Sequence, residues 1–101
     1  MVKVRWSPQA AQDLDAIISF ISRDSSAYAR IFVVDVFEAL DRIGTFPKSG
    51  RIVPELSDPN VREVILGSYR VIYCLKADHA GLVTIHHGAR QLDPKKIGRR
   101  P

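Results

Sequence analysis

The spacing of the apolar residues changes once along this chain, and that change constrains the fold more than any other feature. Before residue 45, apolar residues recur every three or four positions, as they do on one face of an α-helix. After residue 60, they stand in short runs rich in β-branched and aromatic residues, which favour strands. Apart from a short strand-like start, the predicted helices lie in the first half of the chain and the predicted strands in the second, so the sequence predicts an α+β fold.

The first half begins as a strand and continues as two helices. Residues 1–6 alternate apolar and basic side chains, as a short strand does. Ser7 and Pro8 then form a helix start, with an N-cap followed by proline at the first helical position. Two apolar stripes follow, interrupted at "SRDSS" and ended by "GTFPKSG". We expect a helical hairpin over 8–45.

The second half contains three runs with strand character, and the expected meander covers 61–90. The runs are "VREVIL" (61–66), "YRVIYCLK" (69–76) and "LVTIHHGAR" (82–90). Gly67 and Ser68 fit a two-residue hairpin turn of type II′, which prefers glycine in its first position.

The element order predicts how the layers pack. It reads β-α-α-β-β-β, and each element has one apolar side to bury. We expect a single domain over 1–101: a small antiparallel sheet covered on one face by the helical hairpin, with the other face partly open. Residues 91–101 form a basic tail that is too short and too charged to pack alone.

The charge is unevenly distributed. Lys and Arg number five against six Asp and Glu in residues 1–45, and ten against five in residues 46–101. This asymmetry indicates either an acidic partner, such as nucleic acid or an acidic protein segment, or a basic surface that is merely solvated. The single cysteine cannot form an internal disulfide, and no stretch is long and apolar enough for a membrane span, so we expect a cytoplasmic protein.

Strand alternation assigns the side chains of the meander to two faces. We expect these residues to face the helices: Val71, Tyr73, Leu75, Val83, Ile85 and His87. Arg70 and Arg90 then point to the open face, with His86 beside them. Two guanidinium groups on one face suit recognition of phosphate or carboxylate, although strand-borne arginines also serve as surface salt-bridge partners.

Other kinds of site are not indicated by the sequence. Three scattered histidines and one thiol do not match a zinc spacing. The chain has no Gly-rich phosphate loop, nucleophile elbow or paired-carboxylate motif, and we expect neither metal nor cofactor.

The second predicted helix is apolar beyond one face. Ile31, Phe32 and Val34 add to its stripe. The extra width fits either deeper burial between the first helix and the sheet or a docking surface for a partner.

Four segments together resemble a known family. "SPQAAQDLDAIISFI", "FPKSGRIVPEL", "VREVILGSYRVIY" and "HHGAR" occur in the order and at the spacing of the RelE/ParE toxin superfamily, over nearly the whole chain and closest to its ParE branch. The resemblance implies the toxin of a type II toxin–antitoxin system, with a small antiparallel sheet, a helical hairpin and a basic open face.

The resemblance also implies partners. A ParD-like antitoxin would wrap the toxin in a hetero-oligomer and contact operator DNA on its behalf, which favours the docking interpretation of the second helix. The residues expected to bind the antitoxin are Ile31, Phe32, Val34, Arg70 and Ile72.

Two activities divide the superfamily. RelE-like members cut messenger RNA on the ribosome, whereas ParE-like members cleave nothing and poison DNA gyrase. A ribonuclease would use Arg70, His86 and Arg90, but the tail offers no tyrosine or histidine, and arginine, with a pKa above ~12, is a poor acid or base. We therefore favour a non-enzymatic gyrase poison over a ribonuclease or a degenerate member that acts only in operator binding. The residues expected to bind the target or phosphate are Arg62, Arg70, Arg90, Lys95 and Lys96.

Overall fold

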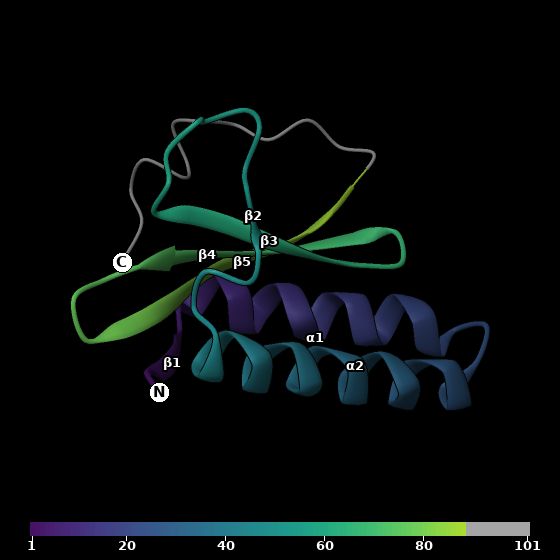
Figure 1. Cartoon of the computed structure of the whole chain (residues 1–101). Helices are drawn as coiled ribbons and strands as arrows, with labels where there is room; N and C mark the ends of the chain where they lie inside the picture. Colours follow the sequence, from purple (N-terminus) through teal and green to yellow (C-terminus); the bar gives the residue numbers. More distant parts are fainter. Residues whose placement is uncertain (89–101) are drawn as a thin grey trace.

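Two antiparallel helices lie against one face of a five-stranded sheet in the computed structural model, which describes residues 1–88 (Figure 1). The elements are β1 (Lys3–Trp6), α1 (Pro8–Ser22), α2 (Ser26–Thr45), β2 (Arg51–Ile52), β3 (Val61–Leu66), β4 (Tyr69–Leu75) and β5 (His79–His87). The predicted α+β class and the order of the helices and main strands are confirmed. Neither helix within this part of the chain has the length and apolar character needed to cross a bilayer.

The sheet is mixed, whereas the sequence analysis expected an antiparallel one. Its strand order is β1-β5-β4-β3-β2. Strands β2 to β5 pair antiparallel, but β1 lies at the edge and pairs parallel with β5, with Lys3 opposite His79 and Trp6 opposite Leu82. The alternation of side chains marks a strand but carries no information on the direction of its partner. The two-residue strand β2 was not expected either.

Each helix begins at a serine N-cap. The Ser25 hydroxyl accepts a hydrogen bond from the backbone N–H of Tyr28 at 3.0 Å. The Ser7 hydroxyl accepts from the N–H of Ala10 at 3.0 Å and also donates to the carbonyl of Val83 at 2.9 Å. Ser7 therefore fixes the start of α1 against β5 in addition to capping it.

The main core lies between the helices and the sheet. Its buried residues are Ala10, Phe32, Val36, Leu40, Ile43, Val71, Tyr73, Ala80, Leu82 and Ile85. Phe32, expected on a docking surface, is only 8% exposed and its ring centroid lies 5.1 Å from that of Tyr69. Part of the extra apolar width of α2 thus belongs to the core.

An irregularity in β5 changes the predicted assignment of faces. The pairing between β4 and β5 shifts register between Ile72 and Tyr73. Val83 consequently packs on the face away from the helices. Strand alternation had predicted that it faces the helices. The Asp13 carboxylate on α1 accepts hydrogen bonds from the Thr84 hydroxyl and, at 3.1 Å, from the Ile85 N–H. Uninterrupted alternation did not anticipate this shift.

The second face of the sheet is not simply open. The segment between β2 and β3 arches over it in Figure 1. Beneath this segment is a second cluster of buried residues, Val53, Val61, Ile72, Cys74 and Val83, with Leu56 packed against it. The region that connects the second helix to the meander therefore has a packing role.

The turn between β3 and β4 matches its prediction. Gly67 has a φ of 58°, a value that favours glycine, and Leu66 pairs with Tyr69 across the turn. This two-residue turn sets the register of the whole β3–β4 hairpin.

Candidate functional site

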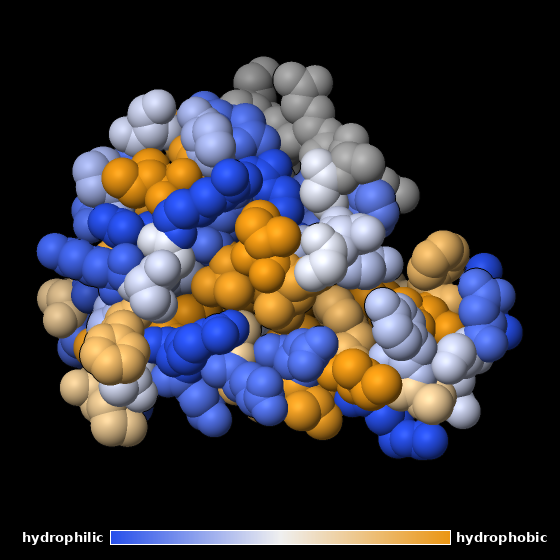
Figure 2. Space-filling view, turned by 45° about the vertical axis from the view of Figure 1, so that its right-hand side comes forward, coloured by the Kyte–Doolittle hydropathy of each residue, from blue (hydrophilic) through white to orange (hydrophobic). Residues whose placement is uncertain are grey.

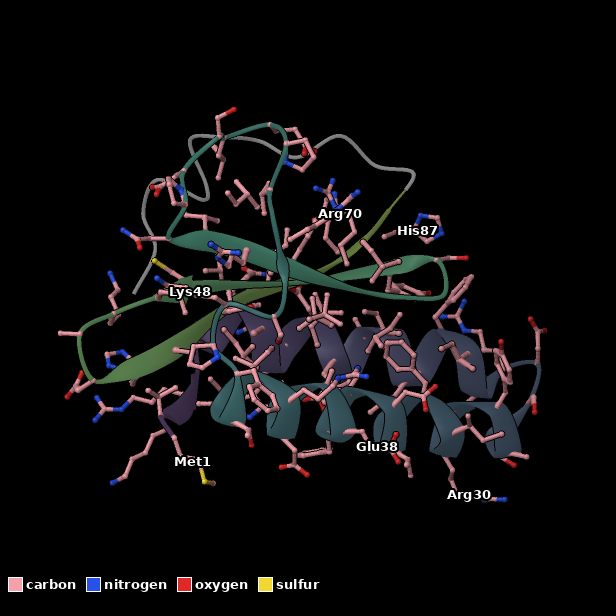
Figure 3. All side chains as sticks on the ribbon, viewed as in Figure 1. Met1, Arg30, Glu38, Lys48, Arg70 and His87 are labelled. Carbon is pink, nitrogen blue, oxygen red and sulfur yellow. The ribbon has the colours of Figure 1, made fainter. Side chains whose placement is uncertain are left out.

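Arg70 lies on the predicted face of β4 but is not available on an open surface. Figure 3 shows it on the side of the sheet away from the helices. Its side chain is only 9% exposed. Its Nη1 and Nη2 atoms donate to the two carboxylate oxygens of Glu55 at 2.7 and 2.9 Å, and its Nε donates to Glu63 at 2.6 Å. The guanidinium fork is thus occupied by two carboxylates of the same chain.

A second arginine completes this ion network, which we define as Arg51, Glu55, Glu63 and Arg70. The Glu63 side chain is fully buried, and it also accepts a hydrogen bond from Arg51 Nε at 2.5 Å. Two positive and two negative groups balance one another. A buried carboxylate with two guanidinium partners has the compensation that a charge in this position requires.

The network shifts the pKa values of its members. Hydrogen bonds from Arg70 hold the pKa of the Glu55 carboxyl at about 2, below its ordinary 4.5. The hydrogen bond to Glu55 in turn raises the pKa of Arg70 above its usual value, with Glu63 contributing. Glu55 and Arg70 are therefore both charged at neutral pH.

An open groove of about 550 Å³ lies beside the Arg70–Glu55 pair. It is lined by Arg51, Glu55, Ile65, Gly67, Ser68, Tyr69, Arg70, His87 and Gly88. The lining joins the ion network at one side to the Tyr69 and His87 rings, whose centroids are 5.3 Å apart and nearly perpendicular. Arg70 and His87 both lie toward the end of the sheet that carries the β3–β4 turn (Figure 3).

The two adjacent histidines separate as strand alternation predicts. His86 is the sheet partner of Arg70, and it is partly buried. His87 is the sheet partner of Tyr69 and is exposed to solvent. Arg90, Lys95 and Lys96, which the sequence analysis named for target or phosphate binding, lie outside the described residues.

A family assignment follows from comparison with known proteins. A family model described as "ParE toxin of type II toxin-antitoxin system, parDE" matches residues 4–92. This chain belongs to the ParE toxin family. Among solved structures, "Chromosomal ParDE TA system from P. aeruginosa" is similar, with a TM-score of 0.69 and 23% identity over 86% of this chain and 96% of that chain. That likeness shows a shared fold. The comparison with curated proteins found no match.

In this ParE-family toxin, the Arg62 side chain forms hydrogen bonds to the backbone of the same chain. Its Nε donates to the carbonyl of Pro59 at 3.0 Å, and its Nη1 donates to the carbonyls of Lys48 and Gly50 at 3.2 and 3.0 Å. These bonds hold the segments on both sides of β2 against β3. Arg62 was expected to bind the target or phosphate, but in the structure its guanidinium group donates hydrogen bonds to backbone carbonyls.

The residues expected to bind an antitoxin divide into buried and exposed groups. Ile72 is fully buried in the second cluster and Phe32 is in the main core, so neither offers a surface. Ile31 and Val34 are each 55% exposed on α2. They continue a series at three-residue spacing that we call the α2 outer row: Tyr28, Ile31, Val34 and Phe37.

Apolar surface is also present near the sheet. Figure 2 shows an apolar patch at the level of the sheet, surrounded by hydrophilic side chains, with further apolar side chains on the helical layer below it. At the β2–β3 edge, Ile52 and Ile65 are 40% and 48% exposed. The toxin therefore carries apolar contact surface on more than one element.

Sequence reasoning missed Glu55 and Glu63, the residues that occupy Arg70. Glu63 could have been found, because the two-residue turn pairs Ile65 with Arg70 and so places Glu63 diagonally across from Arg70 on the same face. Glu55 lies in an irregular segment without strand or helix periodicity, and no local pattern points to its partner. In residues 1–88, no group of three or more His, Cys, Asp or Glu side chains is placed to hold a metal ion.

Proposed function

We propose that this chain is a ParE-like toxin that poisons DNA gyrase, blocks replication and is neutralised by a cognate ParD-like antitoxin. The family match over residues 4–92 supports the toxin class. The similar solved structure is that of a ParDE toxin–antitoxin system. Under this proposal the toxin acts in the cytoplasm, cleaves no nucleic acid itself and reaches operator DNA only through the antitoxin.

The occupied state of Arg70 is the observation that favours gyrase poisoning over RNA cleavage. A ribonuclease needs donors free to stabilise the developing charge on phosphate. The two Nη atoms of Arg70 are instead held by Glu55, and the side chain is nine-tenths buried. The Nη donors of Arg70 are therefore not available to a phosphate group in the groove.

One observation favours the ribonuclease alternative. His87 and Tyr69 line the same groove as Arg70, and His86 is the sheet neighbour of Arg70. Imidazoles titrate near neutral pH and are suited to proton transfer. Two biochemical assays, one on gyrase and one on messenger RNA, distinguish the two functions.

A gyrase assay tests the first proposal. Purified toxin is added to gyrase, ATP and relaxed plasmid, and the DNA is analysed after protein denaturation. We expect linear or nicked plasmid to accumulate with toxin dose, and to disappear when antitoxin is added first. Unchanged supercoiling with no cleaved DNA would contradict the proposal.

Mapping of messenger RNA ends after toxin induction tests the alternative. Under the gyrase proposal, transcripts stay intact while DNA synthesis stops. Ribosome-positioned cuts that vanish in His86→Ala or His87→Ala would establish the ribonuclease instead. Both residues are at least partly exposed, so these variants are expected to fold.

We assign the antitoxin contact to the α2 outer row. Ile31 and Val34 expose apolar surface on a helix that already packs through its opposite side. The double variant Ile31→Ser/Val34→Ser should weaken antitoxin binding at least tenfold, or about 1.4 kcal/mol. The matched control is Ile65→Ser on β3, which is similarly exposed. An equal loss of antitoxin affinity in the double variant and in Ile65→Ser, or no loss in the double variant, would rule out this surface.

A further inference from the structure

The bond between Glu55 and Arg70 has the geometry by which a guanidinium binds an external oxyanion. Nη1 and Nη2 donate in parallel to two oxygens at 2.7 and 2.9 Å. The same fork recognises carboxylate and phosphate. Glu55 thus occupies the position that one face of a phosphate group would take.

The two carboxylates that hold Arg70 differ in how replaceable they are. Glu63 is on β3 and fully buried, and it serves Arg51 as well as Arg70. The Glu55 side chain is 29% exposed and belongs to the segment between β2 and β3, which has no regular structure at this residue. Glu63 is the fully buried partner, whereas Glu55 is accessible from the groove.

Removing Glu55 would change the charge at the groove. The remaining members of the ion network would be Arg51, Arg70 and the single carboxylate Glu63. One positive charge would be uncompensated, and the Nη1 and Nη2 donors would face the groove. A partly desolvated guanidinium whose Nη donors have lost their acceptors attracts anions strongly.

We propose that the groove beside β4 is a phosphate-binding site kept closed by Glu55, which acts as an internal competitor at Arg70. The ligand class is a phosphate group, either free or in a nucleic-acid backbone. Glu55 thereby keeps phosphate from binding the Arg70 guanidinium, which would otherwise be accessible from the groove. This inference goes beyond the proposed function and holds whether the toxin targets gyrase or another macromolecule.

The variant Glu55→Gln tests the proposal in the full-length chain. It removes the charge while keeping the side-chain size. The matched control is Glu38→Gln, an exposed carboxylate on the helical layer, across the sheet from Arg70 (Figure 3). It makes the same change in net charge away from the groove. Inorganic phosphate is the probe, and sodium chloride at equal ionic strength is its reference.

Two readouts report on binding. Phosphate should raise the melting temperature of Glu55→Gln well beyond the general stabilisation seen in the original chain and in Glu38→Gln, because a ligand that binds only the folded state stabilises it. The Nε–Hε nuclear magnetic resonance signal of Arg70 should shift with phosphate in Glu55→Gln alone. This second readout identifies the residue that binds.

The outcomes decide the proposal. A folded Glu55→Gln without an Arg70 response overturns it, and so does an equal response in the original chain. If Glu55→Gln is unfolded, phosphate must restore folding in it or in Glu55→Asp, whose carboxylate reaches less far toward Arg70 because the side chain is one methylene shorter. Failure of both variants to fold in phosphate also overturns the proposal, since an external anion would then not replace Glu55.

A short single-stranded RNA separates the two sources of phosphate. Its binding is followed by fluorescence anisotropy. Binding to Glu55→Gln, competed by inorganic phosphate, assigns the site to nucleic-acid backbones. A response to inorganic phosphate without RNA binding assigns it to small phosphate anions. Gyrase poisoning is measured in parallel, so failure of this inference and failure of the proposed function remain distinguishable.

Discussion

The phenol of Tyr73 holds the chain that leads into β2. Tyr73 is fully buried in the main core, yet its hydroxyl accepts from the N–H of Gly50 at 3.0 Å and donates to the carbonyl of Pro47 at 2.7 Å. Burial raises the pKa of the phenol, so it stays neutral and able to donate. A Cβ on Gly50 would lie 2.6 Å from this hydroxyl, and only glycine fits there.

Replacing Tyr73 with phenylalanine should therefore destabilise the fold. The change removes both hydrogen bonds and leaves the Gly50 N–H without its partner. We expect a loss of about 1–3 kcal/mol in the free energy of unfolding, measured by urea denaturation.

Tyr28→Phe is the control for this prediction. Tyr28 is 64% exposed, so loss of its hydroxyl should change stability by less than about 0.5 kcal/mol. Equal effects of the two substitutions would show that the Tyr73 hydroxyl makes no net contribution.

At the scale of elements, the two serine caps allow a paired measurement. Ser25 only caps α2, whereas Ser7 also bonds to β5 through the Val83 carbonyl. Ser25→Ala should cost about 0.5–2 kcal/mol. Ser7→Ala should cost about 1 kcal/mol more, because the buried carbonyl of Val83 loses its donor. Indistinguishable denaturation curves for the two variants would contradict this account.

The elements themselves were largely predictable from sequence, because local patterns specify them. The Ser7–Pro8 start, the helical stripes and the Gly67–Ser68 turn are signals within a few residues of the structure that they determine. The parallel pairing of β1, the register shift in β5 and the short strand β2 depend on distant partners. Asp13 on α1, for example, bonds with Ile85 on β5. No local period encodes such contacts.

The candidate site was predictable only in part for the same reason. Alternation placed Arg70 on the face away from the helices and His86 beside it, as the sheet register shows. The alternation gave no indication that Glu55, 15 residues earlier, would occupy the guanidinium. The strand determines the face to which a side chain points. Whether that side chain is free to bind a ligand depends on contacts with residues distant in the sequence.

At the scale of the whole molecule, the Glu55–Arg70 bond fastens the β2–β3 segment to the sheet, and it should make stability depend on acid. The folded-state pKa of Glu55, about 2, lies below its ordinary 4.5. The bond's contribution is therefore complete above about pH 4.5 and is lost as the pH falls toward 2.

Comparison with Glu55→Gln across pH measures this contribution. The variant should be less stable by about 1–3 kcal/mol at pH 7, a range that allows for partial solvent exposure. The difference between the two melting temperatures should shrink as the pH falls from about 4.5 toward 2. A difference that stays constant over this interval would show that the carboxylate charge is not responsible.

The net charge of +4 should affect how quickly an antitoxin associates. If the antitoxin segment is acidic, attraction to the basic second half of the toxin raises the association rate at low ionic strength. Stopped-flow measurements should show this rate falling as salt is added, because salt screens the attraction. A rate insensitive to salt would indicate that apolar contact with the α2 outer row dominates the encounter.

The parallel pairing of β1 with β5 also determines when this toxin can fold during its synthesis. Lys3–Trp6 have no strand partner until His79–Leu82 have been synthesised, although the helices between them can form earlier from local contacts. The ribosome therefore has to deliver most of the described chain before the sheet is complete. A prematurely ended polypeptide that stops short of β5 would lack the strand that joins β1 to β4, and we expect proteases to degrade it.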